Sequence, residues 1–142
     1  MRNIWVLSFF MCAWLLLSVP SKAEILWESN YVTSSEDTLY IIDFLLCRDV
    51  VEREPIDIVQ SYTMDDERAW AFARIHNTTG MHNVEFRWFY EDEEYFFMDS
   101  RVGDSPNWRT YSSVTLQPGA WRVEILNKYG TQLREIRFHV SE

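Results

Sequence analysis

The sequence predicts an all-β fold, a two-layer antiparallel sandwich of about seven strands, and three observations predict it. Between residues 69 and 140, apolar and polar residues alternate with a period of two, which is typical of strands that bury one face. Turn signals such as Gln117-Pro118-Gly119 recur between the alternating segments, at the spacing of an all-β domain. No long segment has a helical period. Two sheets that each have one apolar face bury those faces against each other.

The first expected strand is Leu39–Cys47, an apolar run rich in β-forming residues. Because this run does not alternate, we expect a central strand that is buried on both faces, with a short helix as the alternative. Pro55 disfavours helical geometry at Glu54. The segment from Arg53 to Asp57 is therefore expected to be a turn.

The remaining strands follow from alternation. Val84, Phe86 and Trp88 fall on one side of their segment and the charged residues on the other, as in a sheet with one solvated face. The expected strands are 69–76, 84–88, 95–102, 108–116, 121–125 and a last one in which Ile136, Phe138 and Val140 point inward and Arg137 and His139 outward. The connections are the acidic turn 91–94, the loop 103–107, and the turns 117–119 and 127–130. Seven strands with short connections predict an immunoglobulin-like sandwich.

The amino terminus has the features of a secretory signal. Arg2 precedes an uncharged apolar run, Ile4–Leu17, which is shorter than the roughly 20 residues of a membrane-spanning helix. Pro20 then breaks any helix, and small residues at positions 21 and 23 suit a signal peptidase. We expect cleavage after Ala23, a periplasmic protein and no transmembrane segment after cleavage. An uncleaved membrane anchor is the alternative.

Removal of residues 1–23 leaves one domain. Residues 24–38 are polar and lack periodicity, so we expect a lead-in segment there and the β-sandwich over residues 39–142. The expected mature chain has 11 basic and 22 acidic residues, a net charge of −11. A chain with this charge repels phosphate backbones, so nucleic acid is not expected to be a partner.

Cys47 is the single cysteine of the expected mature chain, so an internal disulfide is excluded. Its neighbours Leu45 and Leu46 favour a buried, apolar role. An intermolecular disulfide is the alternative.

Several short motifs, taken in order along the chain, resemble a bacterial family known as domain of unknown function 2914. The resemblance depends on Arg53-Glu54-Pro55, on Val84–Tyr90 with Trp88, on Trp108–Ser113, on Gly119–Leu126, and on Phe138-His139-Val140. The resemblance implies a small β domain of exported or membrane-associated bacterial proteins. It implies no known activity.

Aromatic and basic residues follow each other at Trp108-Arg109 and Trp121-Arg122, so each arginine should face away from its tryptophan. One interpretation is structural: Trp88, Trp108 and Trp121 lie in the core, and the charged residues pair across strands on the solvated face. The other is a binding face formed by Trp108, Arg109, Tyr111, Trp121 and Arg122. In that case exposed rings beside arginine would stack on sugars or dock a partner.

No motif indicates catalysis or metal binding. The acidic clusters 65–67 and 91–94 lie in expected turns and do not match a calcium loop. The histidines lack metal-ligand spacing, and Ser112-Ser113 lacks the glycines of a nucleophile elbow. Asn77-Thr78-Thr79 matches a glycosylation acceptor, which matters only in a eukaryotic secretory pathway. We expect no catalytic residue, no metal and no cofactor.

The sequence therefore favours an exported, non-catalytic binding or assembly module whose partner is a protein of the periplasm or envelope. A sheet face or an open edge strand would form the contact. The first alternative is a glycan-binding domain that uses exposed aromatic residues. The second is a hydrolase with paired carboxylates.

Overall fold

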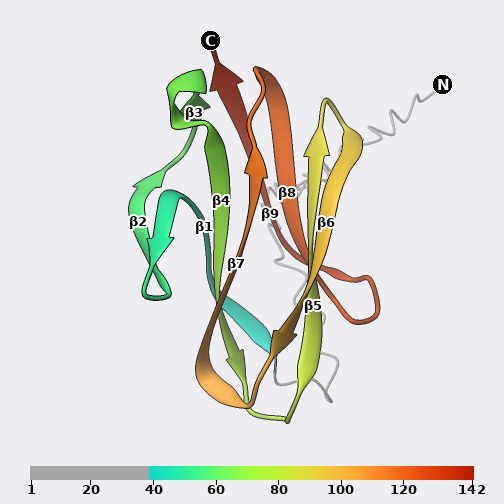
Figure 1. Ribbon diagram of the computed structural model, residues 1–142. Helices are drawn as coiled ribbons and strands as arrows, with labels where there is room; N and C mark the ends of the chain where they lie inside the picture. The colour runs from blue at the N-terminus through green and yellow to red at the C-terminus, as the bar shows by residue number, and fades with distance from the viewer. Residues whose placement is uncertain (1–38) are drawn as a thin grey trace, which may run out of the picture. The chain divides into compact units, whose positions relative to one another are not determined.

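The computed structural model describes residues 39–142, and the expected signal peptide and lead-in segment, residues 1–38, lie outside the described residues. Nine strands form in this part of the chain (Figure 1). They are β1 (Tyr40–Val51), β2 (Glu54–Val59), β3 (Tyr62–Thr63), β4 (Arg68–Asn77), β5 (His82–Tyr90), β6 (Glu93–Val102), β7 (Ser105–Thr115), β8 (Gly119–Asn127) and β9 (Gln132–Ser141), with a 3-10 helix, η1 (Met64–Asp66), after β3.

The strands form two sheets that pack as a sandwich. One sheet has four strands in the order β2-β1-β4-β7, and the other has five in the order β3-β9-β8-β5-β6. All long neighbouring strands are antiparallel, and only the two-residue β3 runs parallel to its neighbour, β9. The predicted all-β sandwich is therefore confirmed.

The strand order is that of an immunoglobulin-like domain. When β1, β4, β5, β6, β7, β8 and β9 are taken as the seven principal strands, β1-β4-β7 faces β9-β8-β5-β6. The constant-type immunoglobulin order differs only in that its fourth strand joins the first of these sheets. Here the fourth strand, β6, pairs with β5 instead, so the open edges of β6 and β7 belong to different sheets.

The core lies between the two sheets and is formed by the predicted alternation. Val84, Phe86 and Trp88 of β5 are buried, and so are Phe138 and Val140 of β9. Ala69, Ala71, Ala73 and Ile75 line the facing side of β4. Because small alanine side chains face large rings, the two layers fill the space between them.

Two strands, β2 and β3, were not predicted. Residues 53–57 were expected to form a turn, but β2 begins at Glu54 and pairs with the end of β1. Pro55 is compatible with a strand there because β2 lies at the edge of its sheet. Glu93 and Glu94 also differ from expectation, because they begin β6 and only Glu91 and Asp92 form the turn.

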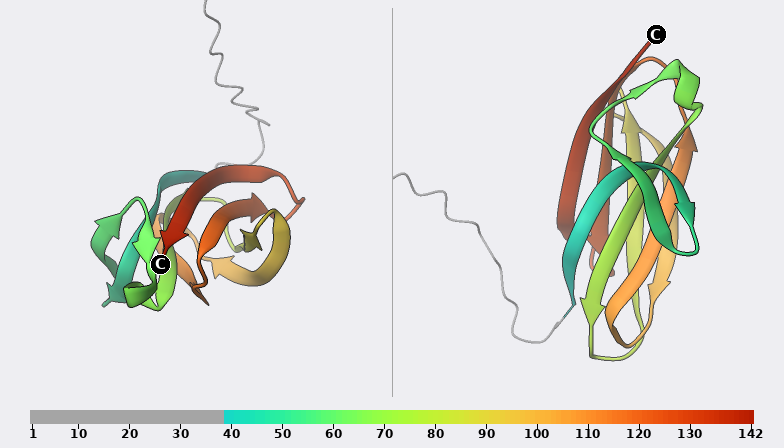
Figure 2. Two further views of the ribbon diagram at one scale, coloured as in Figure 1. Left: turned by 90° about the horizontal axis from the view of Figure 1, so that it is seen from above. Right: turned by 90° about the vertical axis from the view of Figure 1, so that its left-hand side faces the viewer.

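The β1–β2 hairpin lies over the outer face of the four-stranded sheet (Figure 2, right). β1 pairs with β4 as far as Cys47 and then continues with β2 alone. Glu52 and Arg53, at the turn, both have positive φ, as in the two-residue turns of tight hairpins. Phe72 and Cys47, which point away from the main core, are buried on this outer side. The predicted central position of the first strand is confirmed. Its predicted burial on both faces is found only at Leu46 and Cys47, because β2 pairs with β1 from Leu46 onward, whereas Tyr40 and Ile42 before it are exposed.

Candidate functional site

Two motifs that are far apart in the sequence meet at the four-stranded sheet. The Glu54 carboxylate, at the start of β2, lies 2.8 Å from the Arg109 guanidinium of β7. The Arg53 guanidinium lies 5.4 Å from the centre of the Trp108 ring, within the range of a cation–π contact. These four residues hold the hairpin against the sheet, and we call them the hairpin clasp.

The charges around the clasp are balanced. Arg109 lies directly opposite Arg74 of β4, and two like charges in this position repel each other. Each arginine has its own acidic partner: Glu54 pairs with Arg109, and Asp43 of β1 pairs with Arg74. The clasp therefore offers little net positive charge to an anionic ligand.

Aromatic residues continue the same face beyond the charges. Tyr111 lies opposite Phe72 and is 40% exposed. Its ring lies 5.7 Å from the half-buried ring of Trp70. Trp108 instead points inward, packs partly against the core, and covers Gly103, where a Cβ atom would lie 2.6 Å from the ring. Of the predicted binding residues, only Tyr111 presents an exposed ring.

Trp88 and Trp121 are core residues. Trp121 is 2% exposed, and Trp88 is fully buried. Their indole N–H groups are satisfied internally: Trp88 donates to the Ser112 hydroxyl at 3.0 Å, and Trp121 donates to the Gln117 carbonyl at 2.9 Å. Gly119, with φ of +135°, begins the strand that carries Trp121. Both tryptophans and Gly119 have a structural role, and their rings are not available to a ligand.

Arg122 lies on the other side of the molecule, on the outer face of the five-stranded sheet. It pairs with Glu124 of its own strand and stands 3.7 Å from the centre of the Phe89 ring. The five predicted binding residues therefore do not form one site. Which face each residue occupies depends on the sheet that its strand enters, and local alternation does not contain that information.

The outer face of the five-stranded sheet carries a network of ion pairs. Arg87 pairs with Glu85 at 2.5 Å and Arg137 pairs with Glu135 at 2.7 Å. Each of these pairs joins residues two positions apart in one strand, because residues i and i+2 share a face and long side chains reach along it. The expected pairs across strands are also present, between Arg87 and Glu94 at 3.5 Å and between Arg122 and Glu135 at 3.7 Å.

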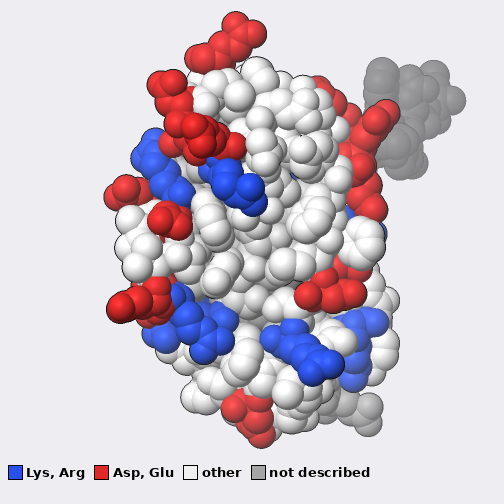
Figure 3. All heavy atoms as spheres, in the orientation of Figure 1, with Lys and Arg blue, Asp and Glu red and all other residues white. Residues whose placement is uncertain are grey.

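The open edges of β6 and β7 lie on the same side of the sandwich (Figure 1). Between these two strands, the Ser100 and Thr110 hydroxyls are 2.6 Å apart. Arg109 is the single charged residue in the whole of β7. Figure 3, in the same orientation, shows an uncharged central surface with charged side chains on either side.

Three consecutive aromatic residues of β6 are exposed at this edge. Tyr95 is 44% exposed, Phe96 42% and Phe97 56%, and we call them the aromatic edge. A register shift opposite Trp88 and Phe89 places an extra residue in β6, as in a β-bulge. Sequence reasoning missed this surface, although four apolar residues in succession, Tyr95–Met98, already break the alternation of the neighbouring strands.

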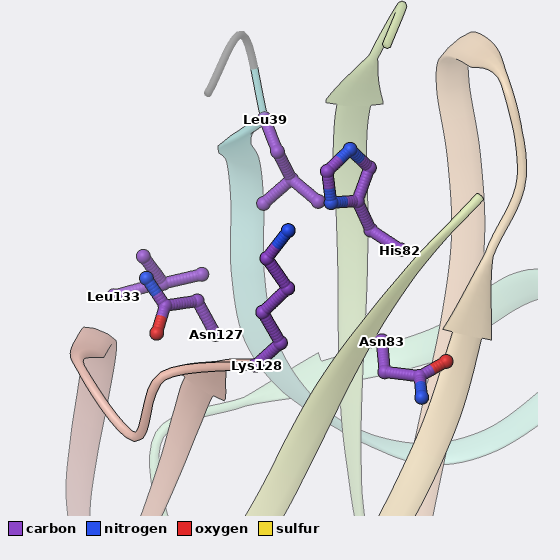
Figure 4. A pocket seen from close by; sticks show the side chains of 6 residues that line it. All are labelled: Leu39, His82, Asn83, Asn127, Lys128 and Leu133. Atoms are coloured by element: carbon purple, nitrogen blue, oxygen red, sulfur yellow. The ribbon is translucent and has the colours of Figure 1, made fainter. Parts of the chain in front are cut away.

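Two hollows on the described part of the chain are small. The one in Figure 4 is lined by Leu39, His82, Asn83, Asn127, Lys128 and Leu133 and has a volume of about 20 Å³, room for about one water molecule. The second is lined mainly by β5 and by the end of β8 with the turn that follows it, and has a volume of about 110 Å³. Pockets for small organic ligands are typically about 300–1,000 Å³.

The acidic cluster at residues 65–67 belongs to the structure of η1. The Asp66 carboxylate accepts hydrogen bonds from the backbone N–H of Thr63 at 2.9 Å and from the Arg48 guanidinium at 2.6 Å. These two contacts lower the pKa of Asp66. An acid held in its ionised form by a structural ion pair is poorly suited to donate a proton.

Three other polar residues singled out in the sequence have internal partners. The Asn77 side chain is buried and donates to the carbonyls of Gly80 at 2.6 Å and Gly103 at 2.9 Å. His76 stacks on Tyr40, and His82 bonds to the Thr79 hydroxyl at 2.8 Å. Within residues 39–142, no group of three His, Cys, Asp or Glu side chains is arranged to hold a metal ion.

Cys47 is buried and its pKa is raised to about 11 by loss of solvent. Its sulfur faces the backbone of β4, 4.0 Å from the Trp70 carbonyl oxygen. The predicted buried role of Cys47 is confirmed. A disulfide to a second chain would require the hairpin to move.

Over residues 39–142, the structure has no helix with the length and hydropathy needed to cross a bilayer.

Comparison with known proteins adds one match. None of the curated proteins matches the chain at a significant level. Residues 82–140 match the model of the family described as Protein of unknown function (DUF2914). The matched residues run from β5 to β9, so Arg53-Glu54-Pro55 lies before them. The resemblance predicted from the Trp88, Trp108 and Gly119 motifs is confirmed: from β5 to β9 the chain resembles the DUF2914 family, whose description states no function.

Proposed function

We propose that this protein is an exported, non-catalytic binding or assembly module whose partner is a protein of the periplasm or cell envelope. One observation carries the proposal: the aromatic edge, Tyr95–Phe97, is exposed on a strand that has a neighbour on one side only. The open side of an edge strand presents unpaired backbone N–H and C=O groups, to which an extended partner segment can hydrogen-bond.

The exposed rings of the aromatic edge provide apolar surface that a partner can bury. Covering about 200 Å² of exposed ring surface is worth about 5 kcal/mol at the usual coefficient, before the costs of association are subtracted. Natural edge strands are commonly protected by charge or by a covering loop. β6 carries charge at Glu93, Glu94, Asp99 and Arg101, but the four residues between Glu94 and Asp99 are apolar or aromatic. This favours a surface that is covered by a partner.

Export is supported by the amino-terminal sequence. The apolar run Ile4–Leu17 and the small residues at positions 21 and 23 favour a secretory signal cleaved after Ala23. The net charge of the expected mature chain, −11, disfavours nucleic acid as a partner. The features of a secretory signal support the proposed location in the periplasm.

A non-catalytic role is supported by the side chains themselves. The carboxylates at residues 65–67 and on the outer face of the five-stranded sheet are engaged in structural contacts, as at Asp66, Glu124 and Glu135. The two hollows are smaller than pockets for organic substrates. A hydrolase with paired carboxylates has no specific observation in its favour.

The proposal is tested by chemical crosslinking in the cells that produce the protein, followed by affinity capture. A tagged full-length chain is expected to retain one partner reproducibly, and Phe97→Thr is expected to lose most of it. Tyr129→Thr is the matched control, because Tyr129 is exposed but lies in the β8–β9 turn. Recovery of the protein alone under several growth conditions, or equal capture by both variants, would contradict the proposal.

A glycan-binding domain is the second candidate, and Tyr111 favours it. Its exposed ring lies on β7 among hydroxyl side chains such as Ser113 and Thr115, and a flat ring beside hydroxyls is a common platform for a sugar. Trp70 lies 5.7 Å from Tyr111, so its fluorescence should respond to a bound glycan. Titration with cell-wall and surface polysaccharides tests this candidate. If the fluorescence of neither the wild type nor Tyr111→Ala changes at millimolar sugar, the glycan-binding candidate is rejected.

A further inference from the structure

β6 has a strongly asymmetric edge. Glu93 and Glu94 lie at its beginning, and Glu91 and Asp92 form the turn before it. The aromatic edge, Tyr95–Phe97, follows immediately. Residues 91–97 are all exposed. A strand that pairs with this edge therefore meets acid at one end and rings in the middle.

The acidic end is incompletely neutralised. Among the described residues, Glu93 takes part in no ion pair, and Glu94 lies 3.5 Å from Arg87 with half of its side chain exposed. Asp92 is 4.0 Å from Arg137, and both side chains are largely exposed. Exposed pairs of this kind contribute about 0–1 kcal/mol at most. The end of the edge keeps a local negative charge that a basic partner would neutralise.

We propose that β6 binds an extended segment of another exported protein, with lysine or arginine at the end that meets Glu93 and Glu94 and apolar residues at its centre. This inference rests on the proposed function and names the chemistry of the partner. The partner strand hydrogen-bonds to the open backbone edge of β6 and thereby extends the five-stranded sheet. Its central apolar side chains cover Phe96 and Phe97.

A second copy of this chain fits the edge less well. If two β6 strands pair antiparallel about Phe97, Glu93 of one strand lies opposite Arg101 of the other, and Asp99 lies two residues from Arg101 on the same face. The Asp99 carboxylate offsets the positive charge that Arg101 brings to the acidic end. The bulge at Tyr95 also interrupts the regular spacing on which self-pairing depends. A segment with lysine or arginine and no acidic residue at this end neutralises Glu93 and Glu94 more fully than a second copy does.

Synthetic peptides test the inference on the full-length exported protein. The probes are two nine-residue peptides of alternating valine and threonine, one with two lysines at its amino end and one with two lysines at its carboxyl end. Two matching peptides carry glutamates in place of the lysines. Fluorescence anisotropy is expected to show that one lysine peptide binds at least about ten-fold more tightly than its glutamate counterpart, equivalent to about 1.4 kcal/mol. Replacing alternate residues by proline should abolish binding, because proline donates no backbone hydrogen bond.

A pair of protein variants locates the effect. Glu93→Gln/Glu94→Gln should remove the preference for lysine, whereas Asp65→Asn/Glu67→Gln, which changes the net charge equally at η1, should keep it. Equal binding of the lysine and glutamate peptides, or binding of none of them, would overturn the inference. Self-association that Phe97→Lys abolishes would also overturn it, because the occupant would then be a second copy. If a partner is captured in cells but the protein binds the lysine and glutamate peptides equally, the proposed function stands and this inference alone is rejected.

Discussion

Tyr62 connects three strands through one hydroxyl group. The residue lies in β3 and is buried, and its O–H donates to the Cys47 carbonyl of β1 at 2.6 Å. The same oxygen accepts a hydrogen bond from the Trp70 backbone N–H of β4 at 3.2 Å. Burial raises the pKa of Tyr62 above the ordinary tyrosine value. The hydroxyl thus remains protonated and able to donate over the whole physiological range.

Tyr62→Phe is expected to lower the free energy of unfolding by about 1–3 kcal/mol. The ring still fills its place, but the Cys47 carbonyl and the Trp70 N–H lose a partner in a buried environment. Urea denaturation at neutral pH measures the change. Tyr129→Phe, at an exposed tyrosine of the β8–β9 turn, should change stability by less than about 0.5 kcal/mol. Equal effects of the two substitutions would refute the role assigned to Tyr62.

The raised pKa of the buried Cys47 thiol predicts that the protein loses stability at alkaline pH. Its pKa rises from 9.0 to about 11 on folding, so the unfolded state releases the thiol proton at lower pH than the folded state does. The stability contributed by the neutral thiol is complete below pH 9 and is lost as pH rises towards 11. The total is roughly 2–3 kcal/mol. Denaturation curves at pH 8 and pH 11 should show a larger fall for wild type than for Cys47→Ala, and parallel falls would contradict this.

The β1–β2 hairpin is an element held by its tip. Arg53 contacts Trp108, and Glu54 pairs with Arg109. Phe72, which points away from the main core, is buried on the same outer side of the sheet. Because the clasp is partly exposed, its contribution to global stability is small, and its main consequence is the position of β2.

Breaking the clasp should therefore loosen one element. Glu54→Gln is expected to speed amide hydrogen exchange in β2 severalfold and to leave β8 unchanged. A double-mutant cycle with Arg109→Gln should give a coupling of about 0.3–1 kcal/mol, the usual range for exposed pairs. Asp57→Asn is the control, since Asp57 is an exposed acid of the same hairpin with no ion pair among the described residues. Acceleration in β8 equal to that in β2 would show that the clasp supports the whole fold.

Elements with one apolar and one polar face could be predicted from the sequence. Val84, Phe86 and Trp88 alternate with charged residues, and all three are buried as expected. β6 could not be predicted in the same way, because an edge strand is defined by the order of strands in the sheet. The clasp could not be predicted either, since it depends on the course of β1 after Cys47. No periodicity in the sequence encodes such a contact between distant segments.

At the scale of the whole molecule, the charged and uncharged parts of the described surface meet along β6. The outer face of the five-stranded sheet carries ion pairs such as Arg87–Glu85 and Arg137–Glu135. The side with the open edges of β6 and β7 has an uncharged centre (Figure 3). A surface that carries many ion-paired side chains is costly to desolvate, whereas an uncharged aromatic surface is not. Phe97 lies opposite Arg87, at the border between the two surfaces, and the exposed rings of Tyr95–Phe97 make the aromatic edge the expected contact surface.

Site-specific photocrosslinking in intact cells tests this claim most directly. A photoreactive amino acid is placed at position 96 or 97 of the aromatic edge, and at position 135 or 139 on the outer face of β9 as a control. The account predicts one discrete protein adduct from positions 96 and 97 and none from the control positions. Adducts from positions 135 and 139 alone, or no adduct from the aromatic edge, would contradict it.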